Sequence, residues 1–167
     1  MKLTPLAENT VAQNSGYTHE VILTPANFAE AAFSEDAGTN DTDLTYTLYT
    51  TAVGDRVIDA AFHLVTPFED QSDAAYNDTK VSLGDEDDPD GFLTATQINV
   101  NGTEVYVKHG DGALIPHTYT AAKDITLLVE SMTAKKLANL DKGHLVIQIE
   151  IDHPDERGLK GSGGIFS

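Results

Sequence analysis

Hydrophobic and polar residues alternate along several segments of the chain, and the longest of these segments is residues 56–68, RVIDAAFHLVTPF. A period of two is typical of a β-strand with one buried face. The positions expected to face the core share this spacing and are Ile58, Ala60, Phe62 and Leu64. At about 3.3 Å per residue, such a strand runs the length of a small domain. We therefore expect the shorter strands to align to it.

The same alternation, bounded by Gly, Pro, Asn and Asp, predicts further strands. Their ranges are 17–23, 43–51, 79–83, 92–100, 104–108, 117–121, 125–130 and 144–152. The short connections at residues 52–55 and at Asn101-Gly102 predict two hairpins, which would pair the strands on either side of each connection. About nine strands with no βαβ rhythm predict an all-β fold, an antiparallel β-sandwich with jelly-roll-like topology.

Helical spacing is limited to two short segments, residues 27–33 and 133–142, which we expect to form surface helices or turns. The chain divides into three parts on composition. We expect an extended N-terminal arm over residues 1–16, a single sandwich domain over 17–153 and a flexible Gly-rich tail over 154–167.

The composition is strongly acidic, with 10 Lys and Arg against 27 Asp and Glu and a net charge of −17. This charge repels phosphate backbones, so nucleic acid is not an expected partner. The absence of Cys excludes disulfides and thiol chemistry. The start of the chain lacks the apolar core of a signal peptide, and no apolar run approaches the ~20 residues of a membrane span. We expect a protein made in the cytoplasm, with no membrane partner.

The sharpest local motif is the acidic turn around Glu86, Asp88 and Asp90, which is followed by Gly91. Carboxylates at alternate positions and a Gly at the sixth match the first half of a calcium loop. The second half does not match, because the twelfth position is Gln97 and offers no bidentate carboxylate. We expect an acidic solvated turn and no cofactor. If the turn does bind calcium, these three carboxylates are the candidate ligands.

Two other polar groups merit testing as sites: His109 with Asp111 and His117, and Glu69 with Asp70 and Asp73. The first could gather a cation or relay a proton, and the second could supply paired carboxylates. Nucleophile elbows, P-loops and dinucleotide-binding fingerprints are missing from the sequence. We predict no catalytic residue and no enzymatic activity.

Several blocks together resemble the small accessory proteins of tailed-bacteriophage heads. They are YTHEVILTPANF, GDRVIDAAFHLVTPFEDQSD, KVSLGD, GFLTATQI and LANLDKGHLVIQIEI. The resemblance covers Tyr17 to Ile151. It implies a β-sandwich cement or decoration protein on the capsid exterior, commonly trimeric, whose terminal arms grip neighbouring capsomers.

A structural virion protein of this kind would bind the major capsid protein and further copies of itself, as a homotrimer. The interface candidates are the apolar residues of the two terminal segments: Leu3, Pro5, Leu6, Ile165 and Phe166. The alternative is a calcium-assisted carbohydrate-binding or receptor-binding module of a phage fibre. Its usual mark, exposed aromatic residues along a groove, is weak in a chain without Trp. An enzyme of unknown type comes third.

Overall fold

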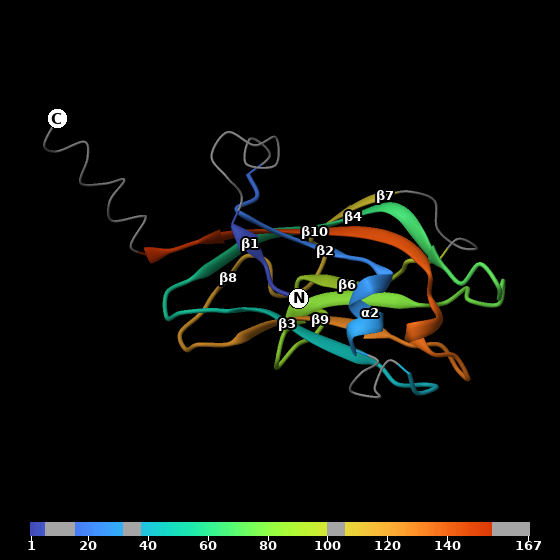
Figure 1. The fold of residues 1–167 in the computed structure, drawn as a ribbon. Coiled ribbons are helices and arrows are strands. Elements are labelled where there is room, and N and C mark those ends of the chain that lie inside the picture. The colour runs from blue at the N-terminus through green and yellow to red at the C-terminus, as the bar shows by residue number, and fades with distance from the viewer. Residues whose placement is uncertain (6–15, 32–37, 100–105, 155–167) are drawn as a thin grey trace, which may run out of the picture.

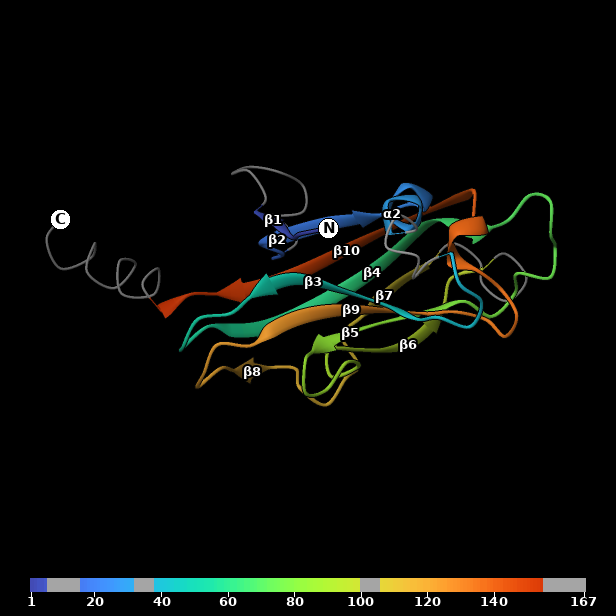
Figure 2. The same cartoon turned by 60° about the horizontal axis from the view of Figure 1, so that its bottom comes forward.

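The computed structural model describes residues 1–5, 16–31, 38–99 and 106–154 of the chain. Two antiparallel sheets pack face to face (Figures 1 and 2). Sheet A contains, in spatial order, β1 (Thr4–Pro5), β2 (His19–Leu23), β10 (Lys142–Asp152), β4 (Arg56–Glu69) and β7 (Tyr106–His109), and β8 (His117–Thr118) also pairs with β4. Sheet B contains β3 (Leu44–Thr50), β9 (Asp124–Glu130), β5 (Lys80–Asp85) and β6 (Leu93–Gln97). The predicted all-β sandwich is confirmed.

Successive strands cross repeatedly from one sheet to the other. The strands β2, β4, β7 and β10 lie in sheet A, whereas β3, β5, β6 and β9 lie in sheet B. Four strands of the six-stranded sheet A, in the order β2-β10-β4-β7, face the four strands of sheet B, in the order β3-β9-β5-β6. This is the two-sheet arrangement of a jelly roll, so the predicted jelly-roll-like topology is also confirmed.

The two predicted hairpins are wrong. The strand β3 pairs with β9, while β4 pairs with β10, β7 and β8, so residues 51–55 cross between the sheets. Likewise β6 pairs with β5 while β7 pairs with β4, and the Asn101-Gly102 turn itself lies outside the described residues. Facing sheets are about 10 Å apart and neighbouring strands about 4.8 Å apart. A few residues can span either distance, so a short connection does not define a hairpin.

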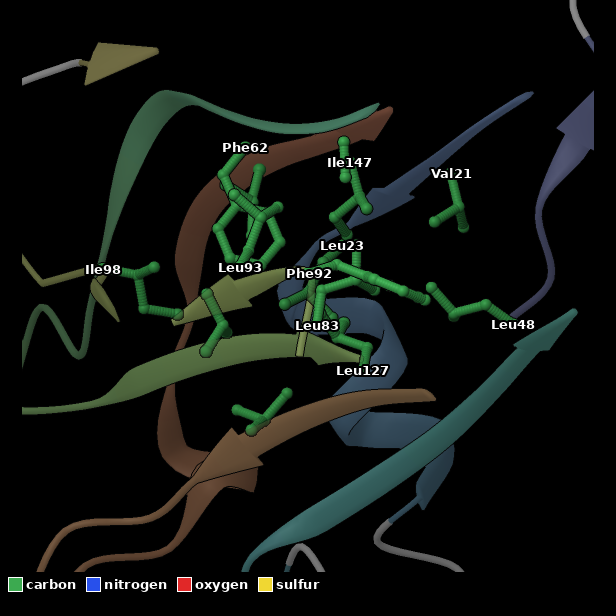
Figure 3. Packing of buried hydrophobic residues seen from close by; sticks show 14 of the residues in the cluster. Val21, Leu23, Leu48, Phe62, Leu83, Phe92, Leu93, Ile98, Leu127 and Ile147 are labelled. Carbon is green, nitrogen blue, oxygen red and sulfur yellow. The ribbon is translucent and has the colours of Figure 1, made fainter. Parts of the chain in front are cut away.

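The core lies between the two sheets, where side chains from both interdigitate. In Figure 3, Phe62 and Ile147 of sheet A point toward Leu83 and Leu127 of sheet B. All four side chains are fully buried. Their burial removes a large apolar area from water, at about 25 cal/mol per Å².

The long strand β4 departs from strict alternation at its start. Ala60, Phe62 and Leu64 are buried as predicted, but Ile58 is only half-buried, and Val57 takes its place in the core. The pairing of β4 with β10 shifts register between Glu150 and Ile151. Such a bulge inserts an extra residue and reverses the faces beyond it.

Helical structure in the described residues is short. The helix α2 (Pro25–Ala31) overlaps the predicted segment 27–33, and its Phe28 is fully buried. The second segment forms only the 3₁₀ turn η2 (Leu137–Asn139). Gly143 does not close a helix: it lies in β10 with φ 149°, where an added Cβ would come within 2.3 Å of the Phe68 ring. The described helices are all too short to cross a membrane.

Residues 1–5 close one side of the sandwich. The strand β1 pairs with β2 of sheet A. The Leu3 N–H donates a 3.0 Å hydrogen bond to the Leu48 carbonyl oxygen in sheet B. Leu3 itself is 8% exposed and belongs to the core. The first residues of the expected arm are therefore part of the sandwich, and residues 6–15 lie outside the described residues.

Candidate functional site at the acidic end of the sandwich

The connections β3–β4, β5–β6 and β7–β9 lie at the same end of the sandwich as the C-terminal end of β10. This end, which we call the acidic end, is on the left in Figure 1. Carboxylates are dense at this acidic end. They belong to Asp55, Asp59, Asp85, Glu86, Asp87, Asp88, Asp90, Asp111, Asp124, Glu150 and Asp152. The described residues also place Arg56 and Lys123 there. The acidic end is thus a surface of strongly negative potential.

The turn between β5 and β6 is held by Asp85. One carboxylate oxygen of Asp85 accepts the N–H groups of Asp87 and Asp88, each at 3.0 Å. The other accepts the Tyr119 hydroxyl at 3.0 Å, and Asp85 is 4% exposed. Burial, with the Asp85 charge, raises the pKa of Tyr119 well above its usual range. Both carboxylate oxygens of Asp85 are therefore occupied by hydrogen bonds that stabilise the turn.

The three calcium candidates do not converge. The Glu86 carboxylate lies 3.1 Å from the Lys123 ammonium, which also contacts Asp87 at 2.9 Å. Asp88 and Asp90 face each other instead, and their hydrogen bond raises the pKa of the Asp88 carboxyl. Across the described ranges, no three His, Asp or Glu side chains are placed to hold a metal ion. The cation that the turn contacts in this structure is Lys123.

The histidine group expected around residues 109–117 is not assembled. His109 Nδ1 lies 3.0 Å from the Tyr17 hydroxyl. Asp111 instead accepts a 2.9 Å hydrogen bond from a backbone N–H of β6. His117 packs edge-on against Tyr119, with 4.7 Å between ring centroids. Because each side chain has different neighbours, the three share no site.

The carboxylates at the end of β4 hold the following turn, at the opposite end of the sandwich. Glu69 pairs with Lys142 at 2.5 Å, and Asp73 pairs with Lys135. Asp70 accepts the N–H two residues further along at 2.8 Å. Each carboxylate has a structural partner of its own, so the expected pairing of two carboxylates across a substrate is not assembled.

A cluster that the sequence did not reveal lies where β10 ends. His153 Nδ1 is 2.9 Å from the Asp55 carboxylate, which is 1% exposed. The His19 ring lies 6.1 Å from the His153 ring and 5.4 Å from the Tyr49 ring. These four residues come from three segments that are distant in the sequence: the start of β2, the end of β3 with the connection after it, and the end of β10. Spacing along the chain therefore does not signal the cluster. The cluster ties the end of β10 to the start of β2 and to the β3–β4 connection.

The described residues next to segments 6–15 and 155–167 lie at this cluster. Pro5 pairs with His19, so the chain leaves the sheet at the acidic end before residue 6. Pro154 directly follows His153 and lies close to Gly54. Of the interface candidates, Leu3 is buried in the sandwich and Pro5 is exposed, while Leu6, Ile165 and Phe166 lie outside the described residues.

The outer face of sheet A carries two facing carboxylates at the acidic end. Glu150 of β10 and Asp59 of β4 are direct cross-strand partners. Burial raises the pKa of Glu150, and the charge of Asp59 adds to this shift. The Tyr17 hydroxyl donates a 3.1 Å hydrogen bond to Asp59, and burial raises the pKa of Tyr17 to about 12. Like charges in direct opposition destabilise a sheet.

The strand order and the two facing sheets define a jelly-roll protein. Neither the family models nor the curated proteins contain a match to this chain. A chain of the cyanophage Pam1 capsid asymmetric unit shares 15% identity at a TM-score of 0.52, over 81% of both chains. A chain of the acidic stable capsid structure of Helicobacter pylori bacteriophage KHP30 shares 19% identity at a TM-score of 0.47, over 68% of this chain and 79% of that one. The Pam1 likeness is one of fold, and it confirms the fold implied by the resemblance to phage head proteins.

Proposed function

We propose that this protein is a structural virion protein that binds the exterior of an assembled phage capsid and stabilises it. The observation that carries the proposal is the jelly roll shared with a chain of the Pam1 capsid asymmetric unit. The sequence resemblance to head accessory proteins points to the same class. The major capsid protein is the expected partner, and the subunits act as a homotrimer.

The places where two further segments join the sandwich support attachment through arms: residues 6–15 connect β1 to β2, and residues 155–167 follow β10. Residues 6–15 and 155–167 both join the sandwich at the acidic end, beside His19 and His153. Two segments that start from one place can engage the same neighbouring surface together. In a trimer, such contacts multiply into high avidity without any single strong interaction.

The apolar residues of these segments supply the contact energy. Leu6, Ile165 and Phe166 lie within polar or Gly-rich sequence. Burying one Leu, Ile or Phe side chain contributes roughly 1.5–3 kcal/mol. A shell surface that accepts them would retain the protein even though its sandwich carries a large negative charge.

The test is co-sedimentation of the purified protein with empty capsids of its own phage, together with the melting temperature of the shells. We expect saturable binding and a shell that melts at a higher temperature when decorated. Phe166→Ala should weaken binding, whereas Ser167→Ala, one residue away, should not. Failure of the intact protein to bind any such shell would refute the assignment, and calcium-dependent glycan binding in its place would favour the fibre-module alternative.

The arms are tested separately. Replacing residues 6–15 with a Gly/Ser segment of equal length, and ending the chain after Pro154, should each weaken shell binding, and the double variant should lose it by orders of magnitude. A double variant that decorates shells at full occupancy would remove the arms from the mechanism and leave the virion assignment in place.

A further inference from the structure

The outer face of sheet A has one half without carboxylates. Strand register places Ile22, Val146 and His63 side by side across β2, β10 and β4. Val65 lies two residues further along β4. Ile22 and Val65 are 42% and 43% exposed, which is unusual for such residues in this chain. We call Ile22, His63, Val65 and Val146 the apolar patch.

Charged residues bound the apolar patch on both sides. On the side of the acidic end, Gln148 donates a 3.0 Å hydrogen bond to the Glu20 carboxylate. On the other side lies the ion pair between Lys142 and Glu69. Between these limits, the described parts of β2, β4 and β10 contain no Asp or Glu. The middle of sheet B also contains no Asp or Glu, over residues 44–50, 80–84, 93–97 and 125–129. The feature that distinguishes this part of sheet A is therefore its exposed apolar side chains.

The outer face of sheet B is different in character. Its middle row pairs Thr45 with Leu128 and Leu128 with Ser82, and it exposes no large apolar side chain among the described residues. The third exposed large apolar residue of the described chain, Val53, is isolated at the acidic end. Contiguous exposed apolar surface is a mark of a protein contact.

We propose that a second copy of this chain docks on the apolar patch. The charge favours this surface for a second copy, because two subunits of charge −17 repel each other wherever their carboxylates meet. The apolar patch combines missing carboxylates with exposed apolar side chains, a combination that the middle of sheet B does not offer. A basic partner would be attracted to the acidic end instead. The inference rests on the proposed function, since it names the surface through which the subunits of the oligomer meet.

An apolar contact between like-charged subunits has a distinctive salt dependence. Added salt screens the long-range repulsion, with a Debye length of about 10 Å at 0.1 M and about 3 Å at 1 M. It leaves the burial of apolar surface intact. Self-association should therefore strengthen as salt rises, whereas a contact held by ion pairs would weaken.

The experiment measures the mass of the isolated protein by sedimentation equilibrium at about 0.05 M and about 0.5 M salt, without any capsid. We expect an oligomer that is tighter at the higher salt. Ile22→Asp and Val65→Asp should each weaken association about 30-fold or more, the range of a central contact residue. Val53→Asp and Thr45→Asp add the same charge at exposed positions outside the apolar patch and should associate almost like the wild type.

Circular dichroism and melting temperature establish that each variant is folded, and either patch variant alone suffices for the test. A wild-type monomer at both salt concentrations would overturn the inference, as would patch variants that associate normally or controls that dissociate equally. A monomer that still binds shells would overturn the inference and leave the proposed function standing. An oligomer that binds no shell would support the inference and refute the proposed function.

Discussion

Replacing Leu3 with Ala should destabilise the isolated subunit by about 2–3 kcal/mol. Leu3 is 8% exposed, packs in the core and donates its N–H to the Leu48 carbonyl oxygen of the facing sheet. Buried Leu→Ala substitutions cost about 2–5 kcal/mol, and less where the surroundings can relax. Leu3 lies at an edge beside a strand of two residues, so its cost should fall at the lower end of that range.

Thermal unfolding of the isolated subunit measures the effect. In a domain of this size, 1 kcal/mol shifts the melting temperature by about 2–4 °C, so Leu3→Ala should lower it by roughly 4–12 °C. Thr4→Ala is the matched control, because Thr4 is exposed and keeps its backbone pairing with Glu20. A Gly/Ser replacement of residues 6–15 retains Leu3 and should change the melting temperature little.

Equal melting temperatures for Leu3→Ala and Thr4→Ala would refute the docking of residues 1–5 between the sheet edges in solution. In that case the whole of residues 1–16 would be available as an arm. A large loss for Leu3→Ala would instead show that arm truncations must begin after Pro5, since deleting Leu3 would confuse unfolding with loss of binding.

Three further results are expected. First, burial and the neighbouring charge of Asp59 raise the pKa of Glu150 in the folded state above its ordinary value of 4.5. The folded protein therefore binds more protons than the unfolded chain above that pH, and stability falls as pH rises through that window. Glu150→Gln should raise the melting temperature at pH 7 and leave it unchanged near pH 3, and equal effects at both pH values would contradict the raised pKa. Second, Gly84→Ala should lower the free energy of unfolding in urea by about 3 kcal/mol or more. The reason is that the added Cβ would lie 1.9 Å from the Asp88 carbonyl oxygen. A variant as stable as the wild type would mean that the turn packs less closely against Gly84 than the structure shows. Third, millimolar calcium should leave the melting temperature unchanged, because the three candidate carboxylates do not converge on one position. An ion bound only to the folded turn would raise the melting temperature. A rise that Asp88→Ala abolishes would show that the turn is a calcium site.

Much of the fold could be predicted from the sequence, because its signal is local. The alternation that buries Ala60, Phe62 and Leu64 is repeated in β10, where Leu145 and Ile147 are fully buried. Two features of the fold could not be predicted from the sequence. The bulge opposite Glu150 reverses the faces at the start of β4, and no residue type marks it. The choice between pairing within a sheet and crossing between sheets depends on distant strands, so short connections were misassigned as hairpins.

The acidic end could be predicted only in part, for a related reason. The acidic turn is continuous in sequence and is found where expected. The partnership of Asp55 with His153 joins residues 98 positions apart, and that of Asp85 with Tyr119 joins residues 34 apart. Such pairs form only when the strand order is set. Spacing along the chain suggested His109 and His117 as one group, whereas strand pairing sends them to different neighbours.

The position of β10 in sheet A governs how the chain can fold as it is synthesised. The strand β2 pairs only with β10 and the two-residue β1 among the described strands, so it has almost no sheet neighbour until residues 142–152 have left the ribosome. Pairing between segments so distant in sequence is slow. Meanwhile the apolar faces of β2 and β4 are exposed and prone to aggregation. A cell that makes many copies of this chain at once would hold a pool of unfinished sandwiches, and we expect the soluble yield to rise when host chaperones are supplied in excess.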